Sequence, residues 1–367
     1  MEINQLPQEM LHAIMLRVSF ETLVECLRVC KKWRTTILDE GFKEKYQHQS
    51  MSRLRLLFLY SEPPERLFQS VCQEKPSLLS SKRQLRFNTD QEFEMVSQPQ
   101  QGLVCLSFEH QFLLCNLGTK KCKTLPRPEG EPSAEVYFFG YDEARGVFKL
   151  LGVPCVNVAR GGRRTQMQPP LVLTVKLAEE ESWRSVEAQQ LPYTPVTESV
   201  CINGVLFYGA RSVVDLNTYK VITFNLESER FGFIDLPDGL QINRIVDTLV
   251  KYQGNVCLVK NHYLESDDGT RGFEVFVKDG NEEDKMKPLF LVIPRWRAVA
   301  KGLPFLFQGT TKNGELVFAT QSVQIDGSHY LLYYNADTQH LRKLKIEGGS
   351  RGDVETYLDH ADTLLLT

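Results

Sequence analysis

The chain has 367 residues, of which 42% are hydrophobic and 24% are charged, a composition typical of folded protein rather than of a disordered chain. A formal net charge of -3 at pH 7 creates no field that would attract nucleic acid or anionic lipid. The first residues contain no basic stretch followed by an apolar one, and the longest apolar runs, such as residues 56–60, are too short to span a bilayer. We therefore expect no nucleic-acid partner, no membrane partner and no export.

The nine cysteines are an odd number. They include no Cys-x-x-Cys pair and lie mostly in apolar runs, which predicts buried thiols in a reducing compartment. The sequence also lacks an Asn-x-Ser/Thr acceptor, and we expect an intracellular protein in the cytoplasm, the nucleus or both. The seven histidines are scattered without metal-ligand spacing, so no metal and no cofactor are expected.

Helical periodicity marks the chain up to about residue 48. Pro7 suits the first turn of a helix, and Glu9 lies near the positive end of that helix. The apolar residues that follow have the i, i+3, i+4, i+7 spacing of an amphipathic helix, and they are Leu11, Ile14, Met15 and Val18.

Two further short helices are predicted. Ser19 is a suitable N-cap for the second helix, whose apolar residues are Phe20, Leu23, Val24 and Leu27. The third helix has Cys30, Trp33 and Ile37 at helical spacing among the basic residues Lys31, Lys32 and Arg34.

Three short helices bury little apolar area on their own. The apolar side chains of this segment exceed what one three-helix unit can hide, and they are Leu6, Leu11, Ile14, Leu23, Leu27, Val29 and Trp33. A groove on a helical partner protein would cover this surface, and each fully buried Leu or Ile would contribute ~1.5 to 3 kcal/mol. The alternative is that the helices pack on the rest of the chain as a cap.

Two kinds of segment recur after residue 100. Strands led by a glycine follow Gly102, Gly146, Gly204, Gly254 and Gly314. Other hydrophobic strands end in Asn-x-x-Thr/Ser turns, whose side chains can bond their own backbone, at Asn116, Asn225 and Asn335. With weaker hairpins near Lys176 and Lys278, the underlying repeat is about 55 residues, near the size of one four-stranded propeller blade.

A β-propeller is the natural interpretation, since radial stacking of small sheets leaves only short strand edges exposed. Strands at 54–60 and 357–366 can combine the two ends of the chain in one closing blade. We expect five to seven blades and favour six, with helices nearly absent beyond residue 60, and a β-sandwich is the alternative. The predicted domains are an all-α segment 1–46, a linker 47–53 and a large all-β domain 54–367.

Residues 6 to 46 resemble the F-box. The matching pattern is Leu6-Pro7-x-Glu9-x-Leu11-x-x-Ile14-x-x-Arg17, then Leu23, then Val29-Cys30-Lys31-x-Trp33-Arg34, and Phe42. Ser19 departs from the family, which commonly has Pro there, and Val18 replaces a common Leu. The resemblance implies docking to a Skp-type adaptor, and through it to a cullin, by Leu6, Pro7, Glu9, Leu11, Ile14, Leu23, Leu27, Val29, Cys30 and Trp33.

Residues 100 to 345 look like the plant F-box-associated domain, a kelch-like repetitive β region. The matching stretches are residues 139–142, 148–150, 183–184, 203–208 and 224–229. The two resemblances together imply the substrate-recognition subunit of a Skp–cullin–F-box ubiquitin ligase, which recruits a target protein for ubiquitylation. The target stays unknown, and two alternatives remain: a propeller enzyme with a helical cap, and an adaptor-bound scaffold without ligase output.

No catalytic constellation is expected. Residues 348–352 match Gly-x-Ser-x-Gly, and Asp359 and His360 follow in hydrolase order, but the strand-then-helix context of a nucleophile elbow is missing. The basic residues Arg160, Arg163 and Arg164 and the acidic runs 179–181 and 282–284 are interpreted as exposed loops and hairpin turns. Trp183 and Trp296 are interpreted as packing residues rather than as ligand platforms.

Overall fold

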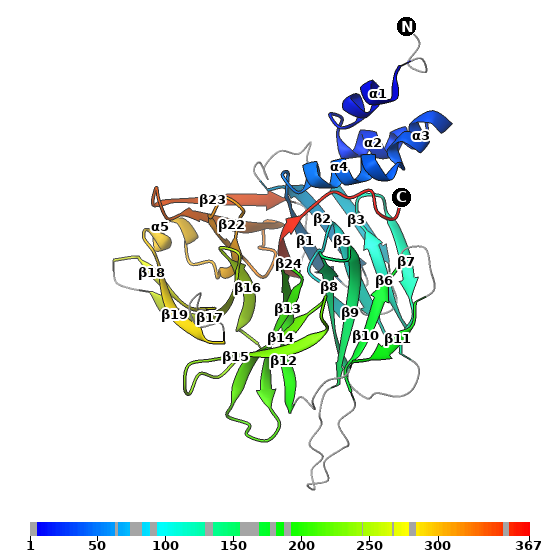
Figure 1. The fold of residues 1–367 in the computed structure, drawn as a ribbon. Coiled ribbons are helices and arrows are strands. Elements are labelled where there is room, and N and C mark those ends of the chain that lie inside the picture. The colour runs from blue at the N-terminus through cyan, green and yellow to red at the C-terminus, as the bar shows by residue number, and fades with distance from the viewer. Residues whose placement is uncertain are drawn as a thin grey trace. The chain divides into compact units, whose positions relative to one another are not determined.

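The computed structural model describes most of the chain (Figure 1). The described residues are 6–62, 65–73, 83–88, 94–128, 135–154, 169–176, 181–186, 192–243, 245–265, 268–278, 284–347 and 352–367. The chain forms two compact units, the first made of residues 1–124 with 355–367 and the second of residues 125–354. None of the described helices is long and apolar enough to cross a membrane.

The first unit begins with the helices α1 (Gln8–Met15), α2 (Phe20–Cys26), α3 (Lys31–Ile37) and α4 (Glu40–Ser50). The three predicted helices are confirmed, and α4 is an addition to them. Asp39 caps α4, because its side chain accepts a hydrogen bond from the Phe42 backbone N–H at 3.1 Å. Phe42 and Tyr46 are the only buried apolar residues of α4, so its amphipathic pattern is too sparse to stand out in the sequence.

The prediction of a linker at 47–53 is wrong for residues 47–50. α4 continues to Ser50, which is buried, and the Gln47 side chain donates from Nε2 to Oε1 of Gln101 at 3.1 Å. These polar residues are therefore packed helix rather than solvated linker. Only residues 51–54 separate α4 from the first strand.

The described strands form six four-stranded sheets, the blades of a β-propeller (Figure 1). Blade 1 contains β24 (Asp353–His360), β1 (Arg55–Glu62), β2 (Glu65–Cys72) and β3 (Arg83–Asn88), and blade 2 contains β4 (Met95–Val96), β5 (Leu103–Phe108), β6 (Gln111–Asn116) and β7 (Lys121–Leu125). Blade 3 contains β8 (Glu135–Asp142), β9 (Val147–Pro154), β10 (Leu171–Val175) and β11 (Trp183–Ser185), and blade 4 contains β12 (Tyr193–Ile202), β13 (Val205–Ser212), β14 (Tyr219–Asn225) and β15 (Arg230–Asp235). Blade 5 contains β16 (Thr248–Tyr252), β17 (Asn255–Glu265), β18 (Arg271–Lys278) and β19 (Met286–Ile293), and blade 6 contains β20 (Leu306–Thr310), β21 (Leu316–Ala319), β22 (Ser328–Asn335) and β23 (His340–Glu347).

The six blades confirm the favoured number, and the β-sandwich alternative is wrong. Blade 1 pairs the last strand of the chain, β24, with the first, β1, as predicted. Beyond residue 60, the described part of the chain contains a single short helix, α5 (Trp296–Ala300). The prediction that helices are nearly absent there is confirmed.

Both kinds of repeated turn lie at the same end of a blade. The glycine-led turns connect the first and second strands, the Asn-x-x-Thr/Ser turns connect the third and fourth, and neighbouring strands of blade 4 are antiparallel. Asn203 and Gly204, with φ of 49° and 73°, form the first turn of blade 4, a conformation that favours Asn-Gly. In its second turn, Asn225 Oδ1 accepts from the Ser228 N–H at 2.8 Å. We call this end of each blade the turn end.

Both tryptophans that were predicted to pack do so. Trp296 is 2% exposed, and its ring lies edge-on to Phe273 and Phe318, with ring centroids 5.2 and 5.1 Å apart. Trp183 is half-buried, packs edge-on against Tyr137 at 5.7 Å and donates from Nε1 to the Pro126 carbonyl at 2.8 Å. Their rings therefore stabilise the second unit.

The cysteine prediction is partly wrong. Cys115 on β6 and Cys122 on β7 form a disulfide, because the turn between these neighbouring strands brings the two residues side by side. Burial raises the pKa of Cys201 to about 11 and that of Cys257 to about 12. The described free thiols are Cys26, Cys30, Cys72, Cys105, Cys201 and Cys257, and Cys155 lies outside the described residues.

Candidate adaptor-docking surface

The first residues of the helical segment are tied to α1 and α3. Pro7 precedes α1 with φ -55° and ψ 148°, and its carbonyl accepts from the Leu11 N–H at 3.1 Å. Lys32 Nζ donates to the carbonyl of Leu6 at 3.0 Å. Pro7 and Glu9 are exposed and Leu6 is half-buried, so the start of α1 presents both an apolar and an acidic side chain to solvent.

Two of the predicted docking residues lie in the core of the helices. Leu11 is 1% exposed and Leu23 is 0% exposed. They belong to one cluster of buried side chains, which is Leu11, Met15, Phe20, Leu23, Cys26, Ile37, Phe42, Tyr46 and Leu364. The expectation that Leu11 and Leu23 add surplus surface is wrong, because Phe42 and Tyr46 of the unpredicted helix α4 share this cluster. These two leucines can influence a partner only through the shape of the helices.

A different set of apolar side chains faces outward. Met10 is 53% exposed, Ile14 is 47% exposed and Val29 is 60% exposed. Pro7, Met10 and Ile14 repeat at i, i+3 and i+7 beside the core positions of α1. This spacing is visible in the sequence and could have identified Met10 as a further outward-facing residue. We call Pro7, Met10, Ile14 and Val29 the outer apolar set.

The remaining predicted residues lie at the edge of the helical core. Leu27 and Trp33 are half-buried and pack against the cluster. Cys30 is also half-buried, and its Sγ caps α3 by accepting from the Trp33 N–H at 3.5 Å. The ten predicted residues thus divide into core, edge and outward-facing groups, and the last group is Pro7, Glu9, Ile14 and Val29.

Ser19 occupies the turn between α1 and α2. It has φ -65° and ψ 156°, and its Oγ accepts from the Thr22 N–H at 3.2 Å. A φ of -65° is the value that a proline ring fixes. Ser19→Pro therefore keeps this φ and loses a cap hydrogen bond that contributes about 1 kcal/mol.

Comparison with known families covers both parts of the chain. Residues 3–45 match the F-box domain, and residues 55–364 match the F-box associated beta propeller domain. The chain belongs to the F-box proteins that carry an F-box associated beta propeller domain. The F-box protein At1g70970 of Arabidopsis thaliana is 35% identical over 96% of each chain, and At1g70960 of the same plant is 35% identical over 98% of each.

Solved structures are more distant from this F-box protein. Apo AztD from Citrobacter koseri aligns with a TM-score of 0.39 and 10% identity, covering 83% of this chain and 98% of AztD. This degree of similarity says nothing about function.

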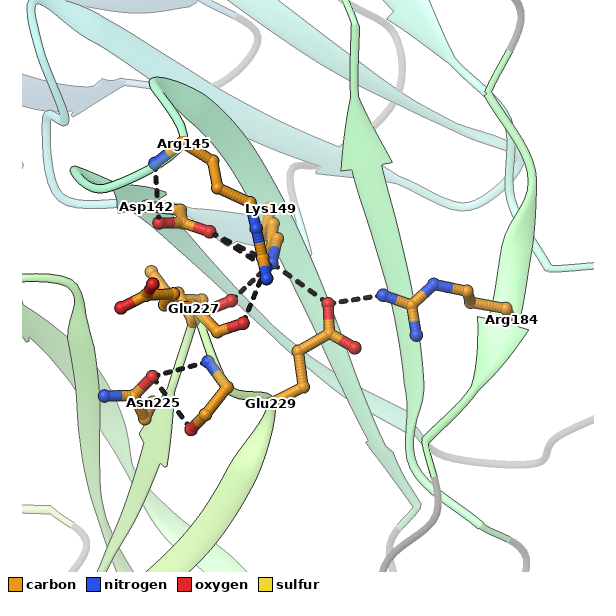
Figure 2. Close-up of polar contacts among 9 residues, drawn as sticks. Asp142, Arg145, Lys149, Arg184, Asn225, Glu227 and Glu229 are labelled. Carbon is orange, nitrogen blue, oxygen red and sulfur yellow. Dashed lines mark hydrogen bonds and ion pairs between the residues drawn. The ribbon is translucent and has the colours of Figure 1, made fainter.

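A charged cluster in the second unit is another candidate site of this F-box protein (Figure 2). Lys149 Nζ lies 3.2 Å from Asp142 Oδ2 and 2.9 Å from Glu229 Oε1, and it also donates to the Leu226 carbonyl. Arg184 pairs with the same Glu229 oxygen. The side chains of Lys149 and Asp142 are 2% and 1% exposed, so this ion pair is buried.

The cluster joins two blades at their turn ends. Lys149 and Arg184 belong to blade 3, and their partner Glu229 ends the second turn of blade 4. Burial by itself raises the pKa of Glu229, but hydrogen bonds from Arg184 and Lys149 hold this pKa below its usual value. A carboxylate kept ionised by two cations suits a structural ion-pair network better than proton transfer.

The other chemical candidates add no site. Residues 348–351 of the possible nucleophile elbow lie outside the described residues, as do the basic loop 160–164 and residues 179–180 and 282–283 of the acidic runs. In the part of the chain that the structure describes, no three His, Cys, Asp or Glu side chains are placed to hold a metal ion.

Proposed function

We propose that this protein is the substrate-recognition subunit of a Skp–cullin–F-box ubiquitin ligase. The observation that carries the proposal is the outer apolar set, in which Met10, Ile14 and Val29 are each about half exposed or more, within a segment that matches the F-box domain. Apolar side chains on short helices fit a hydrophobic groove of a partner protein. The partner is a Skp-type adaptor, which connects the protein to a cullin.

The division of the helical residues supports this assignment. The buried cluster around Leu11 and Leu23 stabilises the helices, which leaves the outer apolar set free to contact a partner. Met10, Ile14 and Val29 are already about half buried, so burying the remainder of each would contribute about 1 kcal/mol. Exposed Arg17, Arg28, Lys31 and Arg34 accompany the set, so an adaptor with acidic residues around its groove fits best.

The blades hold the target protein, and the protein itself performs no chemistry. Ubiquitin transfer is favoured because the receptor raises the concentration of the target near the conjugating enzyme. The complex acts inside the cell, in the cytoplasm, the nucleus or both. The adaptor-docking domain, predicted as residues 1–46, extends to the end of α4 at Ser50, and the target-binding domain is residues 54–367.

The test compares one outer residue with one core residue of α1. Ile14→Asp places a charge where the adaptor groove is apolar, and adaptor affinity should fall at least about 100-fold while the fold is kept. Leu11→Ala should instead destabilise the helices by about 2 to 5 kcal/mol. Glu44→Ala, on the exposed side of α4, is the matched control and should change neither quantity. Unchanged adaptor binding by Ile14→Asp would refute the docking assignment.

The two alternatives are separated by reconstitution. Candidate targets are the cellular proteins that bind to the full-length F-box protein in extracts of cells treated with a proteasome inhibitor. Their ubiquitylation is then tested with purified adaptor, cullin and conjugating enzyme. The proposal requires that wild-type protein supports ubiquitin transfer and that Ile14→Asp does not. A scaffold without ligase output would bind the same proteins without transfer, and an enzyme would convert a small molecule equally well with either variant.

Deleting the helices is a less suitable test. A chain starting at residue 47 would begin inside α4 and would expose the partners of the helical cluster, including Leu364. The point substitution in the full chain avoids this problem. It should act as a trap that binds the target without delivering it, and so should lengthen the target's half-life in cells.

A further inference from the structure

The Asn-x-x-Thr/Ser turn of blade 2 differs from its counterparts in blades 4 and 6. In all three turns, Oδ1 of the Asn accepts from the backbone N–H three residues later. Asn116 is 1% exposed, whereas Asn225 and Asn335 are half-buried. Only at Asn116 do the described contacts include the amide Nδ2, which donates to the carbonyls of Thr363 and Leu365, both at 2.7 Å.

The same turn makes a further contact with the C-terminal segment. Thr119 Oγ1 donates to the carbonyl of Leu366 at 2.9 Å. Leu364, which lies between the bonded residues, is 3% exposed and belongs to the core cluster of the helices. The segment after β24 therefore bonds blade 2 through its backbone and fills the helical core through one side chain.

The third residue of the turn leaves room for α2. A Cβ atom at Gly118 would lie 2.3 Å from Cε1 of Phe20, far inside van der Waals contact. Gly118 is not among the glycines with positive φ, so space rather than backbone conformation requires a glycine here. The corresponding residues of blades 4 and 6 are Glu227 and Asp337, whose side chains would overlap the Phe20 ring.

We propose that residues 116–119 and 361–367, which we call the helix seat, hold the F-box helices in one fixed orientation on blade 2. An adaptor bound to the outer apolar set is then held in a fixed orientation relative to the blades of the first unit. The Gln47 to Gln101 hydrogen bond at 3.1 Å is an additional attachment between α4 and blade 2. The consequence for the adaptor rests on the proposed function, whereas the seating of the helices rests on contacts within the chain.

A fixed seat matters because ubiquitin transfer depends on where the target is held. A flexible tether spreads the effective concentration over a large volume, and a rigid connection concentrates it at one place. Asn116, Gly118, Thr119 and Leu364 are positioning residues in this sense. None of them belongs to the outer apolar set.

The first test measures release of the helices from blade 2. Arg53 is exposed in the short segment between α4 and β1, and trypsin should cleave there when the helices detach. Asn116→Ala removes the two hydrogen bonds to the C-terminal segment as well as the two local bonds of the turn. Loss of the first two should make cleavage of the folded full-length chain roughly tenfold to thirtyfold faster. Asn335→Ala removes the matching turn residue of blade 6 and should leave the rate unchanged. Equal rates for the two variants would overturn the proposal.

Two further variants test the proposal independently, in case Asn116→Ala does not fold. Thr119→Val keeps the side-chain shape and loses one hydrogen bond, so cleavage should be about threefold to tenfold faster. Gly118→Ala should accelerate cleavage through the clash with Phe20, and Glu227→Ala is its control in blade 4. Unchanged cleavage in both Thr119→Val and Gly118→Ala would contradict the seat.

The second test measures orientation directly. Labels carried by non-natural amino acids at Lys31 of α3 and Lys121 of β7, both exposed, report the distance between helices and blade 2. The distribution of distances should be narrow in the wild type, with and without a Skp-type adaptor, and broad in Asn116→Ala. A broad wild-type distribution would refute a fixed seat. Failure of the wild type to bind the adaptor would refute the proposed function and leave the seating result standing.

Discussion

Lys149 of blade 3 and Glu229 of blade 4 form an ion pair between two blades, with Nζ 2.9 Å from Oε1. Lys149 also pairs with Asp142 at 3.2 Å, and both of these side chains are almost fully buried. Lys149 thus bridges two carboxylates at the turn ends of neighbouring blades, while Arg145 pairs with Asp142 and Arg184 with Glu229. Its role is to stabilise the packing of the second unit.

Lys149→Ala should be strongly destabilising. It leaves the buried Asp142 with only the more exposed Arg145, 3.6 Å away, and losing the buried partner of such an ion pair costs about 3 to 5 kcal/mol. Lys220→Ala is the matched control, because Lys220 pairs with Asp235 at 2.6 Å on the exposed surface of the same unit and should cost at most about 1 kcal/mol. Urea unfolding of both variants measures the difference, and similar losses would contradict the structural role of the cluster.

Glu229→Gln should change how the free energy of unfolding depends on pH. The folded-state pKa of Glu229 lies below its ordinary value of 4.5, so its ion pairs contribute stability that is complete above this value and is lost as pH falls through the folded pKa. The difference in unfolding free energy between wild type and Glu229→Gln should therefore shrink as pH drops from 6 towards 3. A constant difference over that range would show that Glu229 is not stabilised as an anion.

His329 should make the second unit sensitive to mildly acidic pH. Burial lowers its pKa from 6.5 to about 3, so the neutral form contributes stability above pH 6.5 that is lost as pH falls below this value. Wild type should lose about 1.4 kcal/mol for each pH unit below 6.5 through this residue. The free energy of unfolding of His329→Gln should therefore fall less between pH 7.5 and pH 5.5 than that of the wild type. Equal falls in the two proteins would disprove this role of His329.

Shortening the chain at residue 310 should prevent a stable fold. The shortened chain lacks β21, β22 and β23 of blade 6 and β24 of blade 1, which leaves strand edges unpaired and prone to aggregation. The expected result is insoluble protein or a broad thermal transition. Soluble protein with one sharp transition would argue that the blades do not depend on these strands.

The repeated turns made the blades predictable from the sequence. Asn116, Asn225 and Asn335 each close a turn by a local hydrogen bond, so their spacing reports the repeat directly. The helices α1 to α3 were predictable for a similar reason, since Leu11 and Met15 follow helical spacing. Local patterns of this kind depend only on residues that are near one another in the chain.

Contacts between distant residues were not predictable. Asn116 and Thr363 are 247 positions apart, and Lys149 and Glu229 are 80 apart, so no local pattern relates them. The expectation that Leu11 and Leu23 add surplus apolar surface was wrong for the same reason, because α4 and Leu364 complete the cluster that buries them. Which apolar residues belong to the helical core and which to the docking surface could be seen only in the structure.

The pairing of β24 with β1 in blade 1 sets an order of events during synthesis on the ribosome. The helices of the F-box emerge before the blades, and blade 1 stays one strand short until β24 leaves the exit tunnel. Leu364 reaches the helical cluster only after that. A chain ended early by a premature stop codon therefore lacks both the closing strand and the residue that completes its own F-box core.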